Sequence, residues 1–184
     1  MSGTLIDMGN VPPLFSGVWN AKRYFRFLAS ANRMCREMGF TVVEVSGLSG
    51  LSELLSASMS FPNVIAVDET SDGYSRITPS PGRRLVKAIY MSMRCAENNM
   101  AARAECFRHL SEIFRQFLSF LALERMRLGD HGLQLDPRVT FNEIDRYFAP
   151  GSACAWFQLT IDASVDLRFR STEWDFPDSR NDQP

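Results

Sequence analysis

The segment ACAWFQLTIDASVDLRF, which spans residues 153–169, decides the fold class of this chain. Apolar side chains recur at every second position from residue 155 onward, namely at Ala155, Phe157, Leu159, Ile161, Ala163, Val165, Leu167 and Phe169. The positions between them are polar. Because successive side chains of a strand point to opposite faces of a sheet, this segment predicts a long strand with one buried face and one wet face.

A second long strand is predicted at residues 85–94, where the odd positions are apolar except for Lys87 and the even positions are partly apolar as well. A strand that is apolar on both faces is either central and covered, or buried in an interface. Segments rich in β-branched residues predict shorter strands at residues 40–45, 63–69 and 138–148.

The longest predicted helix covers residues 99–128, where apolar side chains at steps of three and four form a very wide face. Such a helix either lies across the sheet beneath other elements or meets another subunit. An amphipathic helix is predicted at residues 20–38, with Asn20 as its N-cap and Gly39 as its stop. One or two further helical turns are expected around residues 51–55.

This order of elements predicts an α+β fold with a mixed, mainly antiparallel sheet, a long helix packed on one face and an extra N-terminal helix. A chain of 184 residues suits one domain, and its apolar fraction of 45% is ordinary for a globular protein. We expect an N-terminal arm at residues 1–18, a single α+β domain at residues 19–170 and a flexible C-terminal tail at residues 171–184.

Interface residues are the strongest functional candidates in the sequence. Residues 70–84 are rich in turn-forming side chains and predict a loop that is long for the connection of two strands. Long loops often carry binding surfaces, and aromatic or arginine side chains are enriched in interfaces. We therefore select seven candidates from the loop, the long helix and the tail: Tyr74, Arg76, Arg83, Arg84, Phe117, Phe120 and Trp174.

No catalytic, cofactor-binding or metal-binding residue is predicted. The chain has neither a glycine-rich nucleotide-binding motif nor a nucleophile elbow. Cys106 and His109 are spaced i, i+3, as two metal ligands can be, but no second pair of ligands has matching spacing. A formal net charge of −1 argues against a whole-chain electrostatic contact with nucleic acid or with an anionic membrane. Its four cysteines are not arranged as C-x-x-C and are expected to be buried free thiols.

Carboxylates at the predicted strand ends support a different class of function. Asp68 and Glu69 end one strand, and Glu143 and Asp145 share a face of another. Paired acids can hold Mg²⁺ or act as general acid and base, so a small metal-dependent enzyme or ligand-binding domain is an alternative. A third hypothesis is an adaptor that binds a host protein through its tails. The ordinary interpretation of these acids is the solvated face of strands.

The stretch from Phe61 to Phe169 resembles phage tail-terminator and neck proteins, including prophage-borne ones. The resemblance lies in Phe61-Pro62-Asn63-Val64-Ile65-Ala66-Val67, a polar loop, Leu85-Val86-Lys87-Ala88-Ile89-Tyr90-Met91, Asn98-Asn99-Met100-Ala101-Ala102-Arg103 with the long helix, Phe141-Asn142-Glu143-Ile144 and Trp156-Phe157-Gln158-Leu159-Thr160-Ile161. It covers about three fifths of the chain and is one of element order rather than of sharp motifs. The helix at residues 20–38 departs from the simplest members.

The resemblance implies a homo-oligomeric ring, commonly a hexamer, that caps the tail tube and joins it to the head. The implied partners are further copies of this chain, the tail tube and head-completion proteins, with no membrane, no specific nucleic acid and no cofactor. The implied location is the virion, after assembly in the bacterial host cytoplasm. Head-closure and baseplate components share the same general appearance.

Overall fold

The computed structural model describes residues 20–57, 63–68, 74–76, 82–96, 99–130, 132–145, 151–164 and 172. In chain order its elements are α1 (Ala21–Ala31), α2 (Arg33–Glu37), β1 (Phe40–Val45), α3 (Gly47–Ala57), β2 (Asn63–Asp68), β3 (Tyr74–Arg76), β4 (Gly82–Arg94), α4 (Met100–Asp130), β5 (Leu133–Leu135), β6 (Asn142–Ile144) and β7 (Ser152–Ser164). The predicted arm at 1–18 and Trp174 in the predicted tail lie outside the described residues.

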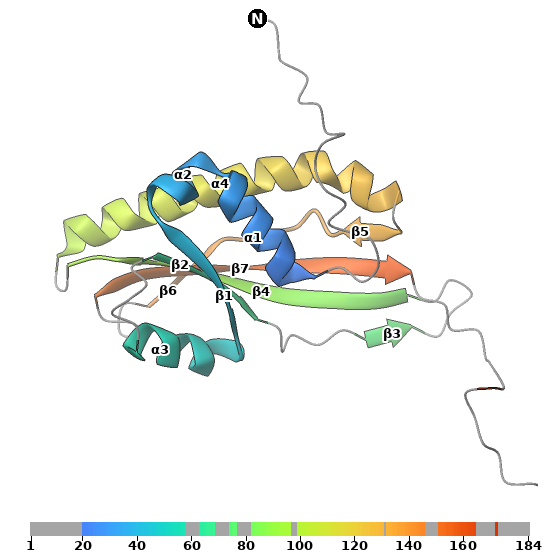
Figure 1. Ribbon diagram of the computed structural model, residues 1–184, viewed down its shortest axis with the longest axis horizontal. Coiled ribbons are helices and arrows are strands. Elements are labelled where there is room, and N and C mark those ends of the chain that lie inside the picture. The colour runs from blue at the N-terminus through green and yellow to red at the C-terminus, as the bar shows by residue number, and fades with distance from the viewer. Residues whose placement is uncertain are drawn as a thin grey trace, which may run out of the picture.

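All of these strands belong to one seven-stranded sheet, whose main path runs β1-β2-β4-β7-β5. The β1–β2 pair is parallel, and every other pair is antiparallel. In Figure 1, α1, α2 and α4 lie above the sheet and α3 lies below it. The predicted α+β class, with a mixed and mainly antiparallel sheet, a long helix on one face and an N-terminal helix, is confirmed.

The central pair of the sheet is formed by the two strands that the sequence pattern predicts best. The strands β4 and β7 pair along their whole length, from Gly82 opposite Ser164 to Arg94 opposite Ser152. Their odd positions are largely buried on one face of the sheet, with Phe157 and Leu159 completely inaccessible to solvent. Each of these strands has another strand on its outer side, so β4 is central in the sheet, as one of the two outcomes expected for it requires.

The main hydrophobic core lies between this face and the helices α1 and α4. The Phe25 ring of α1 lies 6.0 Å from the Phe117 ring of α4 and 5.9 Å from the Phe157 ring of β7, measured between centroids. One aromatic cluster thus joins both helices to the sheet. The long helix therefore packs on the sheet beside α1, and its wide apolar face is covered within the chain itself.

A smaller core covers part of the second face. Leu51 of α3 is buried among Val64, Ala66 and Tyr90 of the sheet, together with Val45 of β1. In Figure 1, α3 lies under the end of the sheet at which α4 begins, and not under the end that carries β3 and β5. The second face is therefore covered by a helix at one end only, within the described residues.

The predicted helix at residues 20–38 is two helices. The Asn20 side chain accepts a hydrogen bond from the backbone N–H of Arg23, as predicted for an N-cap. The chain then breaks at Asn32, whose side chain caps α2 through the N–H of Cys35 and also donates to Gln116 Oε1 of α4 at 2.7 Å. Gly39 ends the segment with a φ of 69°, a conformation that favours glycine.

Short elements account for most of the differences from prediction. The predicted loop at residues 70–84 contains β3 and the first residues of β4. Of the predicted strand at 138–148, only β6 is a strand within the described part, and the three-residue strand β5 was not predicted. The helical turns near 51–55 belong to a longer helix, α3. A three-residue strand is defined by its hydrogen-bonded neighbour and has too few positions to show a period.

Glu124 of α4 is the one carboxylate of the described residues that is almost wholly inaccessible, with 1% exposure. Its Oε1 accepts a hydrogen bond from Arg127 at 2.9 Å, while its Oε2 has no hydrogen-bond partner. Burial raises the pKa of Glu124, and the Arg127 charge opposes that shift. Burial and then the charge of Glu124 also raise the pKa of Tyr24 on α1, so this carboxylate influences the α1–α4 contact.

We expect Phe117→Ala to lower the free energy of unfolding by about 3–5 kcal/mol, because it leaves a cavity in the aromatic cluster. The matched control is Leu123→Ala on the same helix, at a side chain that is 58% exposed, and it should change stability by less than about 0.5 kcal/mol. Urea unfolding followed by circular dichroism measures both values. Equal effects of the two changes would contradict the placement of α4.

We expect Glu124→Gln to raise the free energy of unfolding at pH 7 by roughly 1 kcal/mol, because a buried charge with an unsatisfied oxygen is removed. The raised pKa means that the folded state binds the proton more tightly than the unfolded chain does. Stability is therefore lost as the pH rises through the folded-state pKa, and the advantage of the variant should shrink in acid. Thermal unfolding between pH 4 and pH 7 tests this, with Glu53→Gln on the exposed surface of α3 as the control.

Candidate interaction surfaces

The predicted interface residue Arg84 lies at the end of the β4–β7 pair that α3 does not cover. Arg84 stands directly opposite Asp162 of β7, and the two side chains form a bidentate ion pair. Its Nε–Oδ1 and Nη2–Oδ2 distances are both 2.8 Å. About a third of each side chain remains accessible, so this pair lies at the surface and fixes two neighbouring strands across the sheet.

We call the surface around this pair the distal strand surface; it consists of Arg84, Val86, Ala88, Gln158, Thr160 and Asp162. All six occupy even positions of β4 and β7 and therefore share the second face of the sheet. Gln158 is exposed and the other five are half-buried. Ala88 lies at the inner edge of the surface, where it packs against the smaller core formed with α3. Figure 1 shows this end of the two strands with β3 at its side and no helix beneath it. Apolar atoms at the centre and a charged pair at the rim are typical of a protein–protein interface.

Arg83 and Arg84 do not act together. Arg83 is exposed and stands opposite Ala163, so it points to the face of the sheet that carries α1 and α4. Arg84 points to the other face. The sequence suggested two adjacent arginines beside one loop, whereas strand alternation separates their charges. Tyr74 and Arg76 belong to β3, which pairs with the first residues of β4, and so they lie beside this end of the sheet.

The two phenylalanines selected from the long helix lie inside the fold. Phe117 is 2% exposed within the aromatic cluster, so its selection as an interface residue is corrected: α1 and the sheet cover it. Phe120 is partly buried and packs on the Phe27 ring of α1, with a centroid distance of 5.9 Å. The width of an apolar face shows that a helix is covered but does not show what covers it. Trp174 lies outside the described residues.

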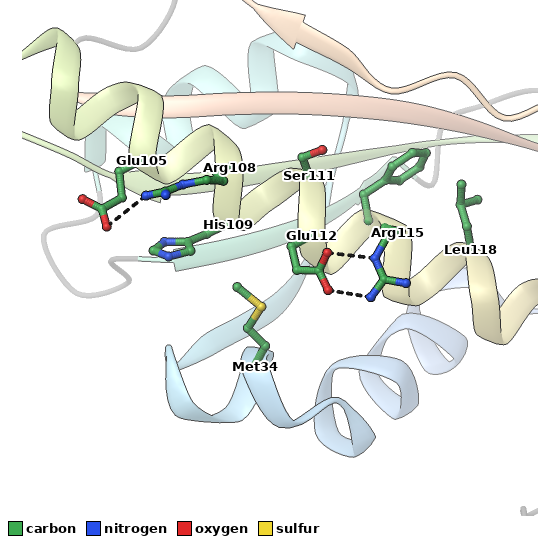
Figure 2. Close-up of a pocket in the computed structure, with 9 residues that line it drawn as sticks. Met34, Glu105, Arg108, His109, Ser111, Glu112, Arg115 and Leu118 are labelled. Carbon is green, nitrogen blue, oxygen red and sulfur yellow. Dashed lines mark hydrogen bonds and ion pairs between the residues drawn. The ribbon is translucent and has the colours of Figure 1, made fainter. Parts of the chain in front are cut away.

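A second candidate is a shallow depression of about 850 Å³ between α2 and the outer side of α4. Figure 2 shows Met34 of α2 facing His109 and Glu112 of α4 across it. Its charged groups are paired along the helix, Glu105 with Arg108 at 3.3 Å and Glu112 with Arg115 at 2.6 Å.

Hydrogen bonds from Arg115 and Gln116 lower the pKa of Glu112 to about 2, so this carboxylate stays ionised at any physiological pH. Carboxylates that are already matched by arginines one turn away offer a ligand little net charge. The depression therefore has the character of a solvated helix surface.

The acidic residues of the alternative hypothesis are not brought together. Asp68 is buried at the end of β2, where it accepts a hydrogen bond from the backbone N–H of Gly47 at 3.3 Å. Glu143 is exposed on β6, and β4 and β7 lie between the two strands. Three strand spacings amount to about 14 Å, and the two side chains point to opposite faces of the sheet. Asp145 follows β6 and is exposed, and Glu69 lies outside the described residues.

Among the residues that the structure describes, no group of three or more His, Cys, Asp or Glu side chains is placed to hold a metal ion. In the same part of the chain, no helix combines the length and the apolar character that crossing a membrane requires.

The sequence reasoning missed Val86, Ala88, Gln158 and Thr160 as possible contact residues. The side-chain pattern of each strand indicated them, because β4 was predicted to be apolar on both faces and β7 to have one wet face. What the sequence did not contain was the register that places these four side chains beside one another. A register is a property of the pair and not of either strand.

No family model matches this chain, and no match to it was found among curated protein sequences.

We expect the Arg84–Asp162 pair to contribute roughly 0.5–1 kcal/mol to stability, the value typical of a partly exposed cross-strand ion pair. A double-mutant cycle with Arg84→Ala, Asp162→Ala and the double variant measures this coupling by urea unfolding. The coupling should decrease at high salt, because accessible charges are screened. A coupling near zero at low salt would contradict the bidentate geometry.

Proposed function

We propose that this protein is a structural subunit that assembles with further copies of itself. In its sharper form the proposal is a tail-terminator or neck protein of a phage or phage-like particle, which forms a ring that caps the tail tube and joins it to the head. In this proposal the chain assembles in the bacterial host cytoplasm and remains in the virion, with the tail tube and head-completion proteins as its other partners.

The distal strand surface carries the first part of the proposal. Two long strands extend beyond the cover of α3 and present half-buried Val86 near exposed Gln158. A half-apolar sheet face of this kind is well suited to packing against another protein surface. Both strands are held in the centre of the sheet, so the surface needs little ordering before it can bind.

A closed ring needs two different surfaces on each subunit, because its contacts run head to tail. The outer edge of β1 supplies a second candidate, since no strand within the described residues pairs with it. An unpaired strand edge presents backbone N–H and C=O groups that can bind another chain. In sheet order, β1 lies at one edge, and β2 separates it from β4 and β7, which carry the distal strand surface. The two surfaces can therefore be occupied at the same time.

The sharper form rests on the resemblance of residues 61–169 to tail-terminator and neck proteins. It does not rest on α4, whose apolar face is covered within the chain. The large apolar side chains that remain exposed in the described part are Leu48, Met100 and Leu123, which belong to α3 or to α4. Apolar residues exposed one at a time are normal on a protein surface.

The test is the solution mass of the full chain, measured by light scattering across a dilution series. We expect a concentration-dependent assembly and, for the ring, a closed species of about six copies. Gln158→Lys places a charge in the distal strand surface at an exposed position and should weaken association at least about tenfold, because the charge must be desolvated in the interface.

The matched control is Ser111→Lys, which introduces the same charge at an exposed position of α4 beside the α2–α4 depression. We expect it to leave the solution mass unchanged. A monomer at every concentration would contradict self-assembly, and a species no larger than a dimer would contradict the ring. Loss of assembly in the Ser111 variant alone would assign the contact to the depression instead.

A further inference from the structure

Two cysteines lie at the junction between the end of β4 and the start of α4. Cys95 directly follows the last residue of β4, and its backbone N–H donates to the carbonyl oxygen of Gly151 at 3.0 Å. The Cys106 thiol of α4 donates to the carbonyl oxygen of Arg94 at 3.6 Å. The Cys106 sulfur is therefore held against the backbone of the residue that precedes Cys95.

The two side chains are themselves neighbours, since Cys95 is close enough to raise the pKa of the Cys106 thiol. Both residues are half-buried, so small reagents can approach them, whereas Cys35 and Cys154 are buried. Strand alternation continued from β4 places Cys95 on the face of the sheet that α4 covers. The Cys95 side chain and the helix α4, which carries Cys106, therefore lie on the same side of the sheet.

We propose that Cys95 and Cys106 form an oxidisable pair that closes into a disulfide linking the end of β4 to the first turns of α4. This is a modification site beyond the proposed function, and it does not depend on that function. The oxidant is a small-molecule disulfide such as oxidised glutathione. The bond would fix the position of α4 along the sheet covalently.

The reaction proceeds by thiol–disulfide exchange in two steps. The thiolate of one cysteine attacks a sulfur of the small disulfide, which releases one glutathione thiolate and leaves a mixed disulfide on the protein. The second cysteine thiolate then attacks the protein sulfur of the mixed disulfide and releases the other glutathione. In total, the two cysteine thiols lose two protons and two electrons, and oxidised glutathione is reduced to two thiols.

The surroundings of the pair set the rate of this reaction. Burial raises the pKa of Cys106, and the neighbouring Cys95 and Glu105 act in the same direction. Thiolate is the attacking form, so the reaction should be slow at pH 7 and should accelerate as the pH rises above the usual range of a thiol. The pair is therefore expected to remain reduced in a cytoplasmic environment and to close in an oxidising one.

Cys154 is the competing thiol on the sheet. It is 2% exposed and its thiol donates to Ser92 Oγ at 3.3 Å. Burial raises its pKa, while Ser92 and Arg103 oppose that shift. The hydrogen bond directs this sulfur toward β4, and its inaccessibility keeps small reagents away. Cys35 is still less reactive, because burial raises its pKa to about 12.

The test uses the folded full chain, incubated with oxidised glutathione at pH 8.5 and analysed by mass spectrometry of the intact protein and of its non-reduced peptides. We expect the loss of two hydrogen atoms and a cross-linked peptide that contains Cys95 and Cys106. The melting temperature should rise by about 5 °C, because a short loop is closed in the unfolded chain. Reduction with dithiothreitol should reverse both changes.

The serine variants provide the controls. Cys95→Ser should abolish the cross-link and the thermal shift, and Cys154→Ser should retain both. Persistence of four free thiols in the oxidised sample would overturn the proposal, as would a glutathione adduct on Cys106 that never resolves. A cross-link between Cys95 and Cys154 would overturn it as well, because it would identify a different pair.

Discussion

The hydrogen-bonded pairing of β4 with β7 is the interaction on which the rest of the structure depends. The two strands pair from Gly82–Ser164 to Arg94–Ser152, and every other strand except β1 joins the sheet directly through one of them. Their register decides which side chains enter the core. A slip by one residue would turn Phe157 and Leu159 away from the helices and place Gln158 against them. The aromatic contact with α1 and α4 would then be lost.

The distal strand surface exists because the β4–β7 pair is longer than the part of its second face that α3 covers. The helices α1 and α4 together cover one face, whereas α3 covers only part of the other. The uncovered part keeps the alternation of a half-buried strand, with Val86 next to polar neighbours. The same strand length that stabilises the core thus produces an exposed face that suits another protein.

The sequence predicted those helices and strands in which apolar side chains recur at a regular spacing. The segments that became β4, β7 and α4 are long enough for periods of two or 3.6 residues to be recognised, and their class was correct. The breaks and short strands depend on distant partners instead. Asn32 interrupts the first helix while bonding to Gln116, and β5 exists only as a partner of β7. For Phe117, the sequence indicated burial but did not identify the covering layer.

The two ends of the β4–β7 pair are held by different side-chain contacts, and the difference bears on the proposed assembly. At the end near α4, Arg103 donates to the carbonyl oxygens of Ser152 and Ile144 at 2.5 and 3.0 Å and stacks on Phe107. A guanidinium that bonds two backbone carbonyls ties the helix to two strands at once. At the other end, the accessible Arg84–Asp162 ion pair joins the strands on the second face. The Arg103 contacts thus anchor α4 at the end of the strand pair opposite the distal strand surface, so the surface proposed for assembly is not part of this anchorage.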